Sequence, residues 1–467
     1  MQRPGVVMAA RRTESLSFAP TSRVLGFAIE ELAELGAAGG GAVPAAERRA
    51  ALEIYARFGP ERRAYPRGWR HDYAALGFDD LHWSSGRARV PALPVHRPAV
   101  PAGPDERSDA PALAVENAGG LVHLASTYLQ PQTSRADPRL TLLALADAQR
   151  TLGARVAATH RRLVDVQTDR FVALSTAFQN CGAYVEVPPD VALDAPVQLV
   201  WTTRPGVAGA IFPHTVVRIG ARARATIVER HVGEGESFVA GTVEIDLAPG
   251  AQLDYVVIQN GDDGARLLGS RVARCAAGAR IGWHVAHLGG ALVRDAIDVR
   301  LDGAGARADI DALFFARGFA NVDLAIACAH RAPRTSSHTV VRDAALDRGR
   351  GRYFGSITVD ADAAGTHATM RDDALILSRN AYLEAVPNLE IDCSEVAVAQ
   401  SASVGTLDRE ALFYVQTRGI ARGRAERMMA LAFFEAAVAR FPTDSIRDEV
   451  RTLLDARLDE IPETFAQ

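Results

Sequence analysis

Lysine is missing from this chain of 467 residues, so arginine supplies all 52 of its basic side chains. A Walker A phosphate loop needs a lysine that reaches the β- and γ-phosphates, and a pyridoxal enzyme needs a lysine amine for its Schiff base. Both kinds of site are therefore excluded. The high content of alanine, glycine, valine and arginine points to a GC-rich genome as the reason for the absence.

Cysteine is scarce, and the four that occur, Cys181, Cys275, Cys328 and Cys393, form no C-x-x-C pair. This spacing fits neither a disulfide framework nor a self-sufficient zinc site. The net charge of -4 argues against a nucleic-acid binder, which would need a basic patch. No run of about 18 apolar residues and no signal-peptide core occur, so we expect a cytoplasmic protein without a membrane segment.

Changes in the spacing of apolar residues along the chain predict three domains. Residues 1–170 are expected to form a mixed α/β domain with helices and a proline-rich linker, and the stretch from Leu140 to Leu163 has helical spacing. Residues 171–405 consist of short alternating runs rich in β-branched residues, which favour strands. Residues 406–467 return to helical spacing.

The middle domain repeats. A Gly-Ala turn recurs at Gly220, Gly250, Gly278 and Gly305, at spacings of 30, 28 and 27 residues, and each turn lies between two strand-like runs. A period of this size is typical of a solenoid, in which each coil buries its apolar face against its neighbours. A β-sandwich would also show frequent short strands, but it has no reason to keep the period. The sequence therefore predicts a mainly β fold built on a β-solenoid.

The C-terminal residues predict a helical hairpin. Apolar residues from Arg424 to Phe441 lie on one helical stripe, and Pro442 ends that helix. Ser445, with Asp448 three residues later, is expected to begin a final helix.

Several segments resemble one family. They share short motifs that are weak one by one and specific together: Leu174–Pro188 (LSTAFQNCGAYVEVP), His330–Ser337 (HRAPRTSS), Phe354–Val359 (FGSITV), Pro387–Ile391 (PNLEI), Ala402–Gly405 (ASVG), Leu412–Tyr414 (LFY), Arg418–Ile420 (RGI) and, more faintly, Gly68–Arg70 (GWR). On these motifs the chain resembles the SufB/SufD family of iron–sulfur cluster assembly scaffold proteins, and is closest to SufD. The resemblance covers residues 170 to 440 well and the first 170 residues poorly.

The resemblance implies a right-handed parallel β-helix with flanking N- and C-terminal parts. Members of the family pair through their β-helices, normally one SufB-type with one SufD-type subunit, and a homodimer is an open alternative. Their C-terminal helices dock SufC, an ABC-type ATPase, and a transient cluster forms at the subunit interface. The chain would then be a scaffold rather than an enzyme, with the ATP chemistry on its partner. Whether it binds a flavin is left open.

One position departs from the family pattern. In SufD-type proteins a histidine usually precedes the ASVG-like turn, often with a cysteine two residues before it; here Gln400 and Val398 occupy those interface positions. A glutamine amide is a poor iron ligand, and a valine side chain cannot bind iron. Ligation of the cluster by this chain is therefore in doubt.

Three other residues are candidate metal ligands. Cys393 lies close to the same edge, and Cys328 and His330 are neighbours in sequence. The alternative for each thiol is a small buried side chain that packs as a hydrophobe, and for the histidine a hydrogen-bonded ring.

Two further pairs of polar residues are predicted not to act together. His284 and His287 point to opposite faces if they lie in a strand, and so do the adjacent residues Asp372 and Asp373. This geometry therefore predicts no metal ion shared within either pair.

The predicted C-terminal hairpin carries a candidate docking surface for the ATPase. Met428 and Met429, together with Phe433 and Phe434, would give an adaptable apolar surface if they are exposed. The alternative is that this stripe packs within the hairpin itself.

Two other functions remain open at this stage. One is a divergent paralogue with a structural role and no cluster ligand, which Gln400 and Val398 favour. The other is a β-solenoid enzyme acting on carbohydrate, which would need carboxylates clustered on one face. Acidic residues are instead dispersed, and aromatic residues make up only 6%, which leaves few rings to stack on sugars.

Overall fold

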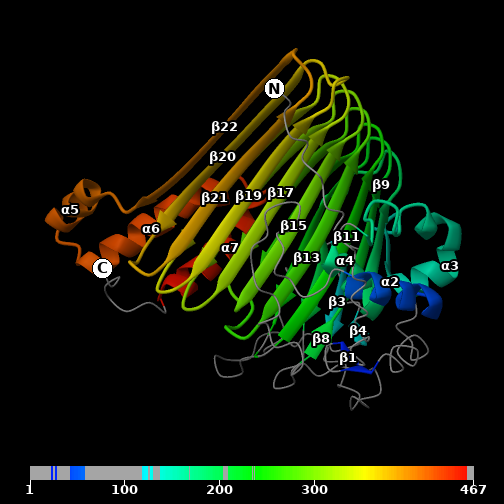
Figure 1. Ribbon diagram of the computed structural model, residues 1–467, viewed down its shortest axis with the longest axis horizontal. Coiled ribbons are helices and arrows are strands. Elements are labelled where there is room, and N and C mark those ends of the chain that lie inside the picture. The colour runs from blue at the N-terminus through cyan, green and yellow to red at the C-terminus, as the bar shows by residue number, and fades with distance from the viewer. Residues whose placement is uncertain are drawn as a thin grey trace, which may run out of the picture.

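The protein is described here by a computed structural model (Figure 1). The residues that the structure describes are 23–24, 27–28, 43–57, 118–124, 127–129, 137–167, 169–202, 209–233, 235 and 237–459. The predicted proline-rich linker and the Gly68–Arg70 motif lie outside these residues.

The described strands form a parallel β-solenoid, as predicted. Between residues 237 and 376 successive strands alternate between two large sheets, so that each strand pairs in parallel with the strands two before and two after it in the chain. The first sheet contains β3 (Gly119–Leu124), β4 (Thr127–Leu129), β7 (Val197–Thr202), β10 (Arg224–Val232), β12 (Gln252–Gln259), β14 (Arg280–His287), β16 (Arg307–Ala316), β18 (Ser336–Ala345), β20 (Thr366–Ile376) and β22 (Val396–Thr406).

The second sheet lies opposite the first. It contains β5 (Thr141–Ala144), β6 (Cys181–Val187), β8 (Gly209–Ile211), β9 (Pro213–Ile219), β11 (Ser237–Leu247), β13 (Arg266–Cys275), β15 (Leu292–Leu301), β17 (Asn321–His330), β19 (Arg350–Val359) and β21 (Tyr382–Ile391). A separate antiparallel pair joins β1 (Arg23–Val24) to β2 (Phe27–Ala28).

The repeated Gly-Ala turns have a physical reason. Gly250, Gly278 and Gly305 adopt φ values of 72°, 65° and 72°, a region that glycine enters without steric cost. The alanine after each glycine is fully buried. Each turn thus reverses the chain between the two sheets and points a small side chain into the interior.

The interior core is built from ladders of inward-facing residues. Ile227, Tyr255, Trp283 and Ile310 occupy one register across four neighbouring strands, and all four are fully buried. Burying a side chain of this size contributes about 1.5–3 kcal/mol. Period-two alternation therefore gives every coil an apolar inner face that only its neighbours cover.

The C-terminal helices cover part of the outer face of the first sheet. Helix α6 (Arg422–Val438) and helix α7 (Asp444–Asp459) form the predicted hairpin and pack on β10 to β20 through an apolar cluster that includes Phe315, Phe434 and Val450. An additional helix, α5 (Arg409–Thr417), which the sequence analysis did not predict, precedes them. None of the described helices is long and apolar enough to cross a membrane.

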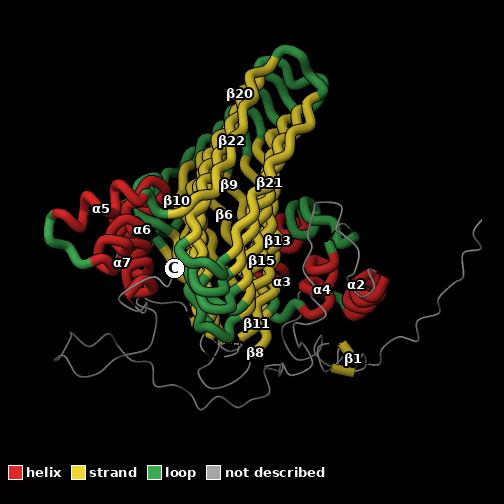
Figure 2. Tube along the Cα trace, turned by 60° about the vertical axis from the view of Figure 1, so that its left-hand side comes forward, coloured by secondary structure: helices red, strands yellow, loops and turns green. Residues whose placement is uncertain are grey.

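The N-terminal helices lie on the opposite side of the solenoid (Figure 2). Helices α2 (Ala45–Arg57) and α4 (Arg170–Phe178) pack on the second sheet, and α3 (Leu145–Ala157) packs near its start. The prediction of one helix from Leu140 was wrong in its first residues, because β5 pairs there with β6. The three-domain division stays a prediction; β3, which precedes residue 171, joins the first sheet.

A buried carboxylate fixes the N-terminal part to the solenoid. Glu244 on β11 accepts hydrogen bonds from the backbone N–H groups of Arg162, Leu163 and Val164 at 2.8–3.1 Å, and from that of Arg161. His214 on β9 lies 3.0 Å from the same carboxylate. Charged acceptors make strong hydrogen bonds to backbone groups, so this contact holds the loop after α3 in place.

Candidate functional site

The solenoid ends on an open coil. Strands β21 and β22 are the last strands of the two sheets, and no further described strand pairs with either (Figure 1). Most residues of β22 are exposed, and Val404 keeps 47% of its surface in contact with solvent. Both strands therefore present unpaired backbone groups and partly apolar side chains, which is the usual condition for pairing with another chain.

The two positions that depart from the family pattern lie on this open coil. Val398 is in register with Ala368 and Gln400 with Met370, and both partners belong to the interior core. Val398 and Gln400 thus face the open end of the solenoid interior, Val398 half-buried and Gln400 exposed. Neither side chain is a good iron ligand.

The three candidate metal ligands do not form a metal site together. Cys328 and His330 are buried in β17, and Cys393 is half-buried just after β21, against the interior core. Both ring nitrogens of His330 are 2.9 Å from hydroxyl groups, those of Thr335 and Ser337. The described residues contain no group of three or more histidine, cysteine, aspartate or glutamate side chains placed to hold a metal ion.

Burial shifts the pKa of both groups, but only for the thiol does the shift itself oppose metal binding. It raises the pKa of the Cys328 thiol to about 12, so the thiol stays protonated at neutral pH. It lowers the pKa of His330 to about 4, and the neutral ring is engaged on both sides.

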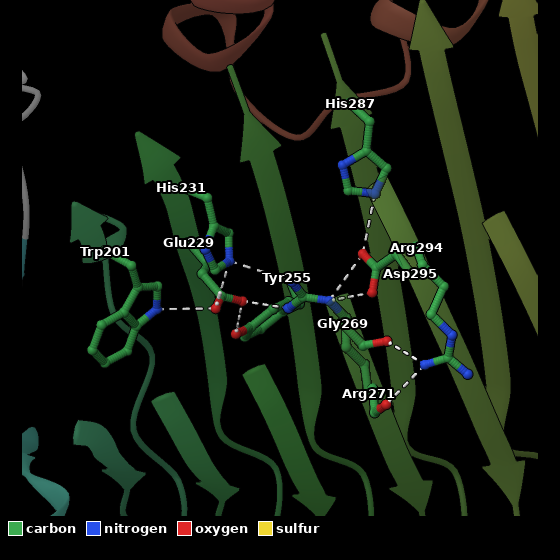
Figure 3. A network of polar contacts seen from close by, with 10 residues as sticks. Trp201, Glu229, His231, Tyr255, Gly269, Arg271, His287, Arg294 and Asp295 are labelled. Atoms are coloured by element: carbon green, nitrogen blue, oxygen red, sulfur yellow. Dashed lines mark hydrogen bonds and ion pairs between the residues drawn. The ribbon is translucent and has the colours of Figure 1, made fainter. Parts of the chain in front are cut away.

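A different polar cluster, which sequence reasoning missed, lies inside the solenoid (Figure 3). Arg271 on β13 donates hydrogen bonds to Glu229 on β10 at 2.5 Å and to Asp295 on β15 at 2.8 Å. His287 on β14 lies 3.1 Å from Asp295. These four side chains connect the two sheets through the core, and we call them the interior ion network.

Further donors surround the carboxylate of Glu229. Trp201 Nε1 donates to it at 3.0 Å, the Tyr255 hydroxyl at 2.7 Å, and His231 Nε2 lies 3.1 Å away (Figure 3). Gly269 makes room for Asp295, because a Cβ at that position would lie 2.1 Å from its Oδ1. The buried charges are therefore hydrogen-bonded on several sides, as buried ions require.

The electrostatics of the network favour charged carboxylates. Burial alone would raise the pKa of Glu229, but Arg271 and His231, together with hydrogen bonds, hold it well below its usual range. Burial would likewise raise the pKa of Asp295, and Arg271 and His287 hold it below its ordinary value. Burial lowers the pKa of His287 in spite of its contact with Asp295.

One signal in the sequence could have revealed this network. Glu229 and His231 are in phase with Ile227 on the same strand, so period-two alternation places them on the inner face. Charged residues in phase with inward aliphatic residues indicate a buried polar cluster, although the partners on the other sheet cannot be read from spacing.

The comparisons with known proteins agree with this architecture. Residues 201–433 match the family described as SUF system FeS cluster assembly, SufBD core domain. An iron-sulfur cluster assembly SufBD family protein of Mycobacterium tuberculosis is 29% identical over 302 residues, 63% of this chain and 75% of the relative. One from Staphylococcus saprophyticus is 26% identical over 285 residues, 60% of this chain and 61% of the relative.

This chain belongs to the SufB/SufD family. The family resemblance read from the sequence is thereby confirmed, and with it a role in iron–sulfur cluster assembly. The closer likeness to SufD stays a prediction.

In this SufB/SufD-family chain the predicted docking residues differ in exposure. Met428 is exposed, whereas Met429 and Phe433 are half-buried. Phe434 is fully buried, with its ring centroid 6.1 Å from that of Phe315 on β16. Phe434 therefore packs the hairpin onto the solenoid, a contact that neither the docking prediction nor its alternative of packing within the hairpin named, and of these four residues Met428 has the largest exposed fraction.

Helix α5 exposes two large aromatic side chains that the sequence analysis did not single out. Phe413 and Tyr414 keep 69% and 58% of their surface in solvent. Asp408 caps the helix by accepting from the backbone N–H of Glu410 at 2.8 Å, so the pair stands on a defined element. The LFY motif could have pointed to them, since an exposed aromatic pair marks a candidate interaction surface.

The interior ion network predicts a large loss of stability when its central cation is removed. Replacing Arg271 with methionine leaves Glu229 and Asp295 buried without a positive partner, and we expect a loss of about 3–5 kcal/mol. The loss should shrink at acid pH, because the two carboxylates can then take up protons. Chemical denaturation followed by the fluorescence of the buried residues Trp201 and Trp283 measures it.

The matched control is Arg274→Met on the same strand. Arg274 faces outward, is 45% exposed and pairs with Asp246 at 2.9 Å, so its removal should cost less than about 1 kcal/mol. Equal losses for the two variants would contradict a special role of the buried arginine.

Proposed function

We propose that this chain is a SufD-like scaffold subunit of a cytoplasmic SUF complex, which pairs with a SufB-type subunit and docks a SufC-type ATPase. The observation that carries the proposal is the open last coil, where both sheets end on an unpaired strand. Family membership supplies the identity of the partners, since members pair through their β-helices. In this proposal the chain performs no catalysis of its own.

The pairing surface consists of β21 and β22 in this proposal. Ile391 and Val404 are among the large apolar residues exposed in the chain, and they lie on these two strands. A partner strand would satisfy the free backbone groups and cover these side chains. A second copy of the chain would satisfy the same geometry, so the homodimer remains an outcome of the test.

A charge on this surface should weaken pairing. Val404→Glu would place a carboxylate where the partner excludes water, and we expect the dissociation constant to rise at least tenfold. The fold of the single chain should be little affected, because Val404 is already largely exposed. The affinity is measured with a SufB-type subunit from the same genome, with size and mass determined by light scattering.

Arg150→Glu on α3 serves as the control, because this exposed arginine lies on the N-terminal side of the solenoid. Unchanged affinity of the Val404→Glu variant for the SufB-type subunit, or an equal loss of affinity in the control, would contradict the assignment of the last coil as the pairing surface. A mass of two identical chains would show a homodimer instead.

The docking surface for the ATPase combines Met428 on α6 with Phe413 and Tyr414 on α5. Truncating the α5 pair with Phe413→Ala and Tyr414→Ala should weaken capture of the SufC-type subunit at least tenfold, because exposed aromatic residues commonly dominate binding energy. The control is Phe319→Ala, at a solenoid turn, where the ring is 77% exposed. Equal capture by the double variant and the wild type would contradict the assignment.

A specific observation favours a second candidate, a subunit that pairs without ligating the cluster. Gln400 and Val398 occupy the usual ligand positions, and both nitrogens of His330 are engaged. On this reading the transient cluster at the interface is held by the partner alone.

Anaerobic reconstitution distinguishes the two candidates. We expect the complex with Cys393→Ala to carry the same iron and acid-labile sulfide as the wild-type complex, because this thiol belongs to no group of three or more candidate metal ligands among the described residues. Loss of half of the iron or more would identify Cys393 as a ligand. Cys275→Ala, at a fully buried thiol in β13, controls for general effects of thiol removal.

A further inference from the structure

Two carboxylates face each other inside the last coils of the solenoid. Asp343 on β18 is in register with Ala374, and Asp372 on β20 with Val341, and both register partners belong to the interior core. Asp343 is 1% exposed and Asp372 is 2% exposed. The adjacent residue Asp373 points outward instead, as predicted for neighbours in a strand.

Three of the four carboxylate oxygens of this pair have no hydrogen-bond donor among the described residues. Both carboxylate oxygens of Asp372 and Oδ1 of Asp343 are buried without a partner, and so is the hydroxyl of Tyr353 on β19. The nearby cation, Arg342, faces outward and pairs with Asp373 at 2.5 Å. Two neighbouring buried carboxylates, with three of their four oxygens lacking a donor, cannot both be charged at acceptable cost, so one proton must lie between them.

The pair lies one coil from the open end. Asp372 is in register with Ala402 on β22, whose methyl group is the only side-chain atom at that place in the last coil. No described strand covers β22 on its other edge. Separation of β22 from β20 would therefore let water reach the carboxylate of Asp372.

We propose that a proton shared by Asp343 and Asp372 keeps the last coil of the solenoid closed, and that loss of this proton loosens β22. When the proton is lost, both carboxylates are charged. Opening of the coil lets water hydrate the newly charged carboxylate, whereas the closed interior offers it no water. The proposal rests on the proposed function only in one respect: the coil that responds to pH is the one assigned to pairing.

The electrostatics of the site support this role. Burial raises the pKa of Asp372 to about 7; a hydrogen bond with Asp343 and the charge of Arg342 lower it, and the charge of Asp373 raises it. Burial, together with the charge of Asp372, raises the pKa of Asp343 well above its ordinary value. The other titratable groups on the inner faces nearby are Tyr353 and Cys328, and β21 and β22 contribute none.

The sign of the pH dependence follows from these directions. The pKa of the carboxyl group is higher in the closed coil than in the open one, so its protonation stabilises the closed coil. This stabilisation is complete below about pH 4, the ordinary pKa of an aspartate, and is lost as the pH rises through about 7, its pKa in the closed coil. The closed coil thus becomes less stable from pH 6 to pH 8.

Hydrogen exchange of the chain without partners tests the proposal. In the wild type we expect the protection factors of β22 amides, corrected for intrinsic exchange, to fall about tenfold from pH 6 to pH 8. In Asp372→Asn the uncharged amide can donate to Asp343, so the protection should be nearly independent of pH. Asp373→Asn, at the adjacent outward-facing residue, leaves the buried pair in place and should keep a fall in protection with rising pH, displaced to lower pH because Asp373 raises the pKa of Asp372.

Asp343→Asn provides a second variant of the same pair if Asp372→Asn fails to fold. Protection that does not fall in the wild type, or that falls equally in the wild type and in the Asn variants of the pair, would overturn the proposal. So would an equal effect of Asp373→Asn. Because no partner is present, these outcomes are independent of the Val404 pairing measurement, and either proposal can fail alone.

Discussion

The rest of the structure depends on one constraint: each coil of the solenoid buries its inner side chains only against the coils next to it. In the middle of the chain both neighbours are present, and the ladder from Ile227 to Ile310 is fully buried. At the last coil one neighbour is absent among the described residues, so β22 is mostly exposed and β21 is mostly half-buried. The same rule therefore produces a stable body and an end that is suited to a partner.

The covered interior also tolerates charge, provided that the charge is compensated. Glu229, Arg271 and Asp295 form a hydrogen-bonded network that connects the two sheets. Asp343 and Asp372 lie in the same kind of environment without a cation facing them. The difference is one of partners rather than of burial, and it makes the first cluster a structural element and the second a group that responds to protons.

The helices on the outer faces divide the surface into parts with different roles. On the first sheet, Arg440 pairs with Asp311, and Arg230 pairs with Glu449 at 2.6 Å. Salt bridges as well as apolar packing therefore hold the C-terminal hairpin on the solenoid. On the second sheet, Glu244 holds the loop after α3. Most residues of β22 stay exposed beside both groups of helices, so the surfaces proposed for pairing and for ATPase docking lie on different elements, β22 and α5.

The sequence by itself determined the solenoid, the family and the C-terminal hairpin, because these depend on local periodicity and on short motifs. The 27–30-residue spacing of glycine turns and the period-two strands are properties of neighbouring residues. Only the tertiary structure decided which charged residues meet, since Arg271 and Glu229 lie on different sheets. It also decided which aromatic side chains are buried, because Phe434 packs against the solenoid while Phe413 is exposed. Such contacts depend on how distant strands and helices pack, and one sequence contains no direct record of that packing.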